Sequence, residues 1–60
     1  MVDPLVVRLH ARRLELELSQ RALAESIGVG HGHLSRIETG AVDPKLSTIR
    51  RMAERLGVPI

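Results

Sequence analysis

Apolar residues recur every three or four positions along most of this 60-residue chain, which is the spacing of amphipathic helices. Glycine and proline residues divide the pattern into four segments. No segment alternates apolar and polar residues with a period of two, so no strand is expected. The pattern therefore predicts an all-α fold, a compact bundle of four short helices.

The first predicted helix begins after Asp3, whose carboxylate would cap free amide groups, with Pro4 at the first helical position. Its inner face is predicted to consist of Val6, Leu9 and Leu16. Arg13 falls on the same stripe. Because a charge that points inward needs a partner, the sequence predicts one for Arg13.

Residues 20–39 carry small, apolar and glycine positions in an order that predicts two short helices joined by a tight turn. Ser19 is expected to cap the first, which runs from Gln20 to Ile27. Gly28 would supply the positive φ of the turn, and Val29 would fill it. The buried positions of this helix are predicted to be Leu23, Ala24 and Ile27.

The second helix of this segment is predicted to open at Gly30 and to close at Gly40. Leu34 and Ile37, three residues apart, would form its buried stripe. Gly32 lies inside the helix, where glycine costs about 1 kcal/mol of stability relative to alanine. A reason other than helix stability is therefore expected for glycine at this position, such as close approach of the backbone to a ligand. The outward face would carry five residues: His31, Gly32, Ser35, Arg36 and Thr39.

A fourth helix is predicted because Asp43 followed by Pro44 repeats the opening signal of the first helix. Gly57 and Pro59 would end it. Its one-sided apolar stripe is predicted to consist of Leu46, Ile49, Ala53 and Leu56.

The composition is that of an ordinary globular domain, with 43% hydrophobic and 27% charged residues and no cysteine. A formal charge of +2 is by itself weak evidence for a nucleic-acid partner. Because Phe, Tyr and Trp are absent, duplex DNA is favoured over single strands or RNA, which are usually bound by stacking. The longest apolar run near the N-terminus covers only residues 5–7, so no membrane segment is expected and the cytoplasm, at the nucleoid, is the expected compartment.

The sequence does not predict an enzyme, since it lacks cysteine, tyrosine and the glycine pattern of a nucleophile elbow. His31 and His33 suggest a metal site, yet residues two apart on a helix point about 200° apart. No metal and no cofactor are therefore predicted.

Several short motifs lie in one register over fifty residues, and with them the chain resembles the helix-turn-helix domain of the phage repressor and Cro family, also called the xenobiotic-response-element family. These motifs are Leu18-Ser19-Gln20, Leu23-Ala24, Ile27-Gly28-Val29, Leu34-Ser35-Arg36-Ile37-Glu38, Gly40 and Arg51-Met52-Ala53-Glu54-Arg55-Leu56-Gly57-Val58. The resemblance implies that residues 1–60 form one DNA-binding domain like that of the lambda repressor, with its motif at 20–39. The fifth helix usual in the family is missing from these residues.

The resemblance also implies roles for individual residues. The helix from about 30 to 39 would lie in the DNA major groove, and Arg36 would donate two hydrogen bonds to a guanine. Arg13 and Glu38 match a structural ion pair of the family, and Glu17 stands where a residue tolerant of positive φ is common. The positions that match base contacts are His31, Gly32, Ser35 and Arg36. Those assigned to the DNA backbone are Gln20, Arg21, His33, Thr39 and Lys45.

The function implied is sequence-specific binding of double-stranded DNA by a transcriptional repressor, acting as a homodimer on a palindromic operator. Val58 and Ile60 are the exposed candidates for a self-contact, unless they lead into a further C-terminal domain. Because fold does not determine function, an alternative stays open. The domain could be a protein-interaction, antitoxin-like or regulatory module of a larger protein, with weak or no specific DNA binding.

Overall fold

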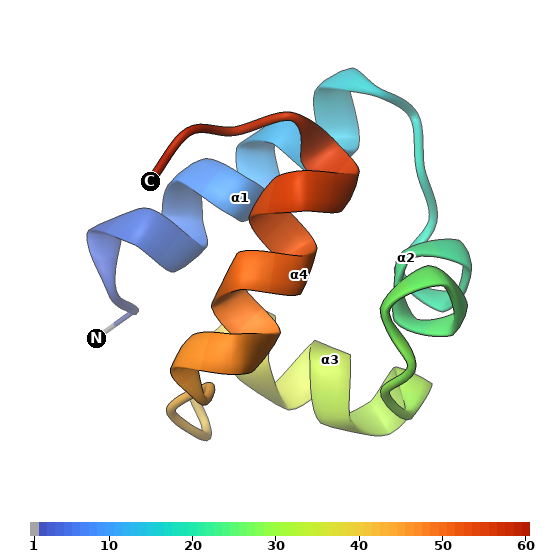
Figure 1. The fold of residues 1–60 in the computed structure, drawn as a ribbon. Helices are drawn as coiled ribbons and strands as arrows, with labels where there is room; N and C mark the ends of the chain where they lie inside the picture. The colour runs from blue at the N-terminus through green and yellow to red at the C-terminus, as the bar shows by residue number, and fades with distance from the viewer. Residues whose placement is uncertain (1) are drawn as a thin grey trace.

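A computed structural model describes residues 2–60, which form four α-helices and, within that range, no strand. The helices are α1 (Pro4–Glu15), α2 (Gln20–Ile27), α3 (His31–Thr39) and α4 (Leu46–Leu56). Figure 1 shows α4 crossing in front of α1, with α3 below them and α2 at the side. The predicted all-α bundle of four short helices is confirmed. None of these helices is long and apolar enough to cross a membrane.

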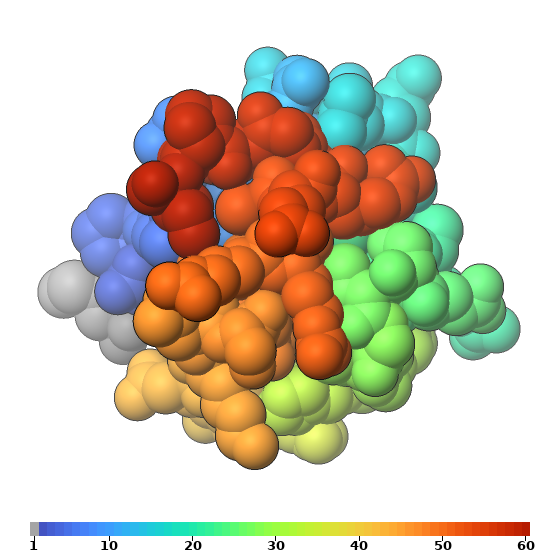
Figure 2. Space-filling model, in the orientation of Figure 1, coloured from blue at the N-terminus to red at the C-terminus, as the bar shows by residue number. Residues whose placement is uncertain are grey.

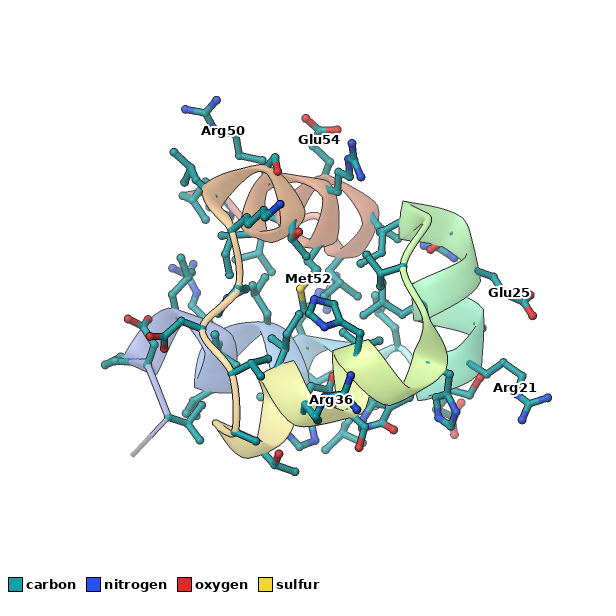
Figure 3. All side chains as sticks on the ribbon, turned by 90° about the horizontal axis from the view of Figure 1, so that it is seen from below. Arg21, Glu25, Arg36, Arg50, Met52 and Glu54 are labelled. Atoms are coloured by element: carbon teal, nitrogen blue, oxygen red, sulfur yellow. The ribbon has the colours of Figure 1, made fainter. Side chains whose placement is uncertain are left out.

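All four helices contribute to one hydrophobic core. Met52 of α4 is fully buried and lies between the helices in Figure 3, while Figure 2 shows α4, in orange, across the centre of one face. The buried stripes predicted for residues 20–39 are confirmed, and Val29 packs against the core from the turn. The buried hydrophobic residues are Val6, Leu9, Leu23, Ala24, Ile27, Leu34, Ile37, Ile49, Met52, Ala53 and Leu56.

The end of α1 differs from the prediction. Asp3 caps the helix as expected, accepting a hydrogen bond from the Leu5 N–H at 2.8 Å, but Leu16 is 43% exposed and is not part of the inner face. Leu16 still continues the helical repeat, because its N–H donates to the Arg12 carbonyl oxygen at 3.1 Å, but it is the C-cap residue, one position beyond the end of the helix, and its side chain lies outside the core. Glu17 then adopts φ 55°, which turns the chain toward α2 and brings Leu18 against the core.

The start of α4 also differs from the prediction. Lys45 is its N-cap residue and makes no side-chain capping bond, so Asp43 and Pro44 lie in the preceding loop instead of opening the helix. Leu46 is the first residue of the helix and is 61% exposed, because it projects beyond the end of the core. Thr48 and Ile49 occupy the buried positions of this turn instead.

Two glycines fix the ends of α2 and α3. Gly28 has φ 75°, and the Val29 N–H then donates to the Ala24 carbonyl oxygen at 3.0 Å. Gly40 has φ 84°, and a Cβ at this position would lie 2.8 Å from Cγ2 of Val2. Left-handed backbone favours glycine at both positions, and a side chain at the second would also force Val2 to shift.

Candidate nucleic-acid interface

The α2–turn–α3 unit is built so that one side is buried and the other is exposed. The side-chain oxygen of Ser19 accepts a hydrogen bond from the Ala22 N–H at 3.0 Å and so caps α2. The apolar residues of α2 and α3 face the core described above, with Leu23 and Leu34 completely buried. This packing fixes the angle between the two helices and turns the polar side of α3 outward.

The outward side of α3 carries the residues assigned to base contacts. His31, Gly32 and Arg36 are exposed, and Ser35 is half-buried. Figure 3 shows Arg36 on α3 and Arg21 on α2, away from α4. Among the positions assigned to the DNA backbone, Arg21, His33, Thr39 and Lys45 are exposed, and Gln20 is half-buried. These residues come from α2, α3 and the residue before α4.

Gly32 and Arg36 are neighbours on the surface of α3, one turn apart. A Cβ built on Gly32 would lie 3.8 Å from Nη1 of Arg36, which is an ordinary contact distance, and would meet no other protein atom within 4 Å. The fold therefore has room for a side chain at position 32. Glycine is present here without an internal steric reason, and the Arg36 guanidinium would be in ordinary van der Waals contact with a Cβ at this position.

The inner side of α3 is held by a polar cluster of buried Arg13, buried Glu38 and half-buried Gln20, which we call the Glu38 cluster. Arg13 donates from Nε to Oε2 of Glu38 at 2.8 Å and from Nη2 to Oε1 at 3.0 Å. Gln20 donates from Nε2 to Oε1 at 2.7 Å. One carboxylate thus joins α1, α2 and α3. The sequence provided Arg13 and Glu38, but not the contact of Gln20 with Glu38.

Burial makes the Glu38 cluster a fixed structure. The side chains of Arg13 and Glu38 are 9% and 2% exposed, and Arg13 also donates from Nη1 to the Leu18 carbonyl oxygen at 2.7 Å. The His10 Nε2 atom lies 4.0 Å from Oε1 of Glu38. Two parallel hydrogen bonds to a carboxylate define the orientation of both groups, so this cluster fixes how α3 sits against α1 and α2.

Two arginines that sequence reasoning left without a role hold the ends of helices. Arg12 donates from Nε to the Leu56 carbonyl oxygen at 3.2 Å, at the end of α4. Arg51 donates from Nη1 to the Ile27 carbonyl oxygen at 3.5 Å, at the end of α2. Cations are favourable at the negative end of a helix. Arg50 points away from α3 on the far side of α4, as Figure 3 shows.

The C-terminal residues expected to be exposed differ from each other. Val58 is half-buried and packs against the core, so its expected exposure is wrong, whereas Ile60 is 63% exposed. The Val58 N–H donates to the Ala53 carbonyl oxygen at 2.9 Å and draws the residue onto α4. Within residues 2–60, no three His, Asp or Glu side chains come together as a group that could hold a metal ion.

The arrangement of two short helices around a glycine turn, with one polar side and one anchored side, is that of a helix-turn-helix unit. The helix-turn-helix family matches residues 9–60, and the chain belongs to this family. The resemblance seen in the sequence is thereby confirmed.

One relative is a transcriptional repressor, RstR, of the cryptic phage CTXphi from Vibrio cholerae. It is 42% identical over 48 residues, which cover 80% of this chain and 43% of that protein. The chain therefore spans less than half the length of this relative. The comparison with solved structures found no match.

Proposed function

We propose that this domain binds double-stranded DNA in a sequence-specific way and acts as a transcriptional repressor, with α3 in the major groove. The observation that carries the proposal is the polar, exposed side of α3 on a helix whose other side is fixed by the Glu38 cluster. Membership of the helix-turn-helix family and the similarity to a phage repressor support it. Its place of action would be the cytoplasm, at the nucleoid.

In this proposal Arg36 reads sequence most strongly. Its guanidinium donates two parallel hydrogen bonds to O6 and N7 of one guanine, which discriminates against other bases by about 1 to 3 kcal/mol. His31 and Ser35 contact neighbouring base edges. Gly32 lets the helix backbone approach the groove, since no internal contact requires glycine there.

The DNA backbone is held by side chains at the margins of α2 and α3. Gln20 uses one N–H for Glu38 and has the second N–H of its amide for a phosphate oxygen, beside the α2 N-terminus. Arg21, His33, Thr39 and Lys45 supply the remaining backbone contacts. Because Arg12 and Arg51 are used inside the domain, affinity for the phosphates is modest for a single copy.

Two copies would bind one palindromic operator. The domain measures 24 × 22 × 19 Å, so two domains fit side by side on successive turns of one duplex face, whose major grooves are about 34 Å apart. Two weak half-site contacts then act together, which raises affinity and requires symmetry of the DNA sequence.

Selection of bound duplexes from a random pool at low salt tests the proposal. We expect enrichment of one half-site motif that contains a guanine, together with its inverted repeat. The Arg50→Ala variant serves as a control, because Arg50 faces away from α3. This variant should enrich the same motif as the parent chain. Enrichment of no motif would contradict the proposal and favour a protein-interaction module.

A further inference from the structure

The outer side of α1 carries an apolar stripe that the core does not use. Pro4, Val7, Ala11 and Leu14 recur at spacings of three, four and three residues, and all four are exposed. Val7 is 53% exposed and Leu14 is 58% exposed. We call these four residues the α1 seam. Their spacing is that of the contact positions of a coiled coil.

The α1 seam points away from the rest of the domain. The buried residues of the same helix are Val6, Leu9 and Arg13, and at 100° per residue the seam lies roughly opposite to them. The buried side of α1 packs against α3 and α4, and Figure 1 shows α1 on the outside of the bundle. An occupant of the seam therefore leaves the outward side of α3 uncovered.

The charges beside the seam indicate its occupant. Arg8 and Glu15 are exposed, lie on the same flank of the seam and are seven residues apart. In the part of the chain that the structure describes, neither forms an ion pair. When two copies of one helix pack antiparallel about a two-fold axis, a given flank of one helix lies beside the same flank of the other. The two helices run in opposite directions, so a residue near the start of the flank faces a residue near its end.

We propose that the α1 seam is a self-association surface, on which a second copy of this chain packs its own α1 antiparallel. Arg8 of each copy then meets Glu15 of the other, so the flank is complementary to itself. Val7 of each copy packs on Leu14 of the other. Ala11 lies at the two-fold axis, where its short side chain lets the two helices approach closely. This contact forms without DNA and uses none of the residues assigned to DNA contacts.

The seam is short, which sets the strength of the contact. From Pro4 to Leu14 a helix rises about 15 Å, so the buried area falls below the roughly 1,200 Å² of stable interfaces. The association is therefore weak in solution, with a dissociation constant of about 0.1 to 1 mM. Two copies bound at adjacent half-sites have a high effective concentration, and there the contact adds cooperativity.

Sedimentation velocity on the 60-residue chain, from low micromolar concentration to about 1 mM, measures the association directly. Arg8→Glu and Glu15→Arg should each weaken it about tenfold, because two attractive pairs per dimer become repulsive. The double variant Arg8→Glu/Glu15→Arg reverses both charges and should return to within about threefold of the parent. Leu14→Gln should abolish the association, since it removes the largest apolar contact of the seam.

The Ile60→Gln variant tests the C-terminal end as an alternative surface. It should associate like the parent, because Ile60 lies outside the seam. Circular dichroism checks that every variant is folded, as expected for changes at exposed positions. The proposal is overturned if the parent chain stays monomeric at about 1 mM. It is also overturned if the double variant associates as weakly as the two single variants, or if Ile60→Gln loses the association. Binding to an isolated half-site should be the same in all variants, so failure of the seam is distinguished from failure of DNA binding.

Discussion

The two halves of α3 differ in what fixes them. The C-terminal half is anchored by buried Leu34 and Ile37 and by Glu38, which accepts hydrogen bonds from α1 and α2. The N-terminal half begins at Gly30 without a side-chain cap, contains Gly32, and exposes His31 and His33. Local propensity therefore does little for this helix, and tertiary contacts at one end hold it. The difference suggests separate roles for the two halves. The C-terminal half sets the orientation of α3, and the N-terminal half is available to a partner.

The largest effect is expected from breaking the anchored half. Arg13→Met leaves the buried Glu38 carboxylate with Gln20 as its remaining close partner, and the free energy of unfolding should fall by about 3 to 5 kcal/mol. Urea denaturation measures the change. Arg50→Met, at an exposed position on α4, is the matched control and should change stability by less than about 0.5 kcal/mol.

A second variant separates the lost ion pair from lost packing. Arg13→Met/Glu38→Leu removes both charges together and should recover most of the stability, because no uncompensated charge stays buried. If Arg13→Met cost no more than the Arg50 control, the Glu38 cluster would not be the anchor of α3.

The next effect concerns the exposed side of α3. Arg36→Ala should reduce discrimination at one base position by about 1 to 3 kcal/mol and leave stability almost unchanged, because the side chain is exposed. Competition binding with operators changed at single positions measures this. Gln20→Ala is the comparison and should weaken binding to all sequences alike. An Arg36→Ala variant that lost affinity equally on every operator would contradict the role of Arg36 in reading sequence.

The sequence predicted the parts of the fold that depend on local signals. The glycine ends of α2 and α3 and their buried stripes follow from helical spacing and from positive φ at Gly28 and Gly40. Leu16 and Leu46 were wrongly placed in the core, because periodicity does not tell where a helix ends. That depends on the turn at Glu17 and on the loop before Lys45.

For the candidate site, the sequence indicated which residues belong to α3 but not how the cluster is assembled. The burial of Arg13 could be predicted from its place on an apolar stripe. The contact between Gln20 and Glu38 joins residues 18 positions apart and depends on the angle between two helices, which no local pattern encodes. The same holds for Arg12 and Arg51, which reach carbonyl oxygens of distant helix ends.

A smaller effect is expected at Gly32, where stability and binding should change in opposite directions. Gly32→Ala places a methyl group where the fold has room for it, so unfolding should require about 1 kcal/mol more free energy. Binding to the selected operator should nevertheless weaken, because the methyl group keeps the helix backbone from approaching the groove. Thermal unfolding and operator titration on the same samples measure both.

Ser47→Ala is the control for the Gly32 variant. It also replaces an exposed helical residue by alanine, but on α4, and should leave operator binding unchanged. If Gly32→Ala bound the operator as tightly as the parent, close approach of the backbone would not be the reason for glycine at this position.

The smallest effect is expected at the turn that precedes α2, on the anchored side of the molecule. Glu17 has φ 55°, a left-handed conformation that costs a residue with a side chain roughly 1 kcal/mol. Glycine avoids this cost, but it loses more conformational entropy on folding, which offsets part of the gain. Glu17→Gly should therefore stabilise the domain by about 0.5 kcal/mol net, as measured by urea denaturation. Glu17→Ala removes the same charge but keeps the strain. Equal stabilisation by both variants would assign the effect to charge, whereas a gain confined to glycine would assign it to the left-handed backbone at position 17.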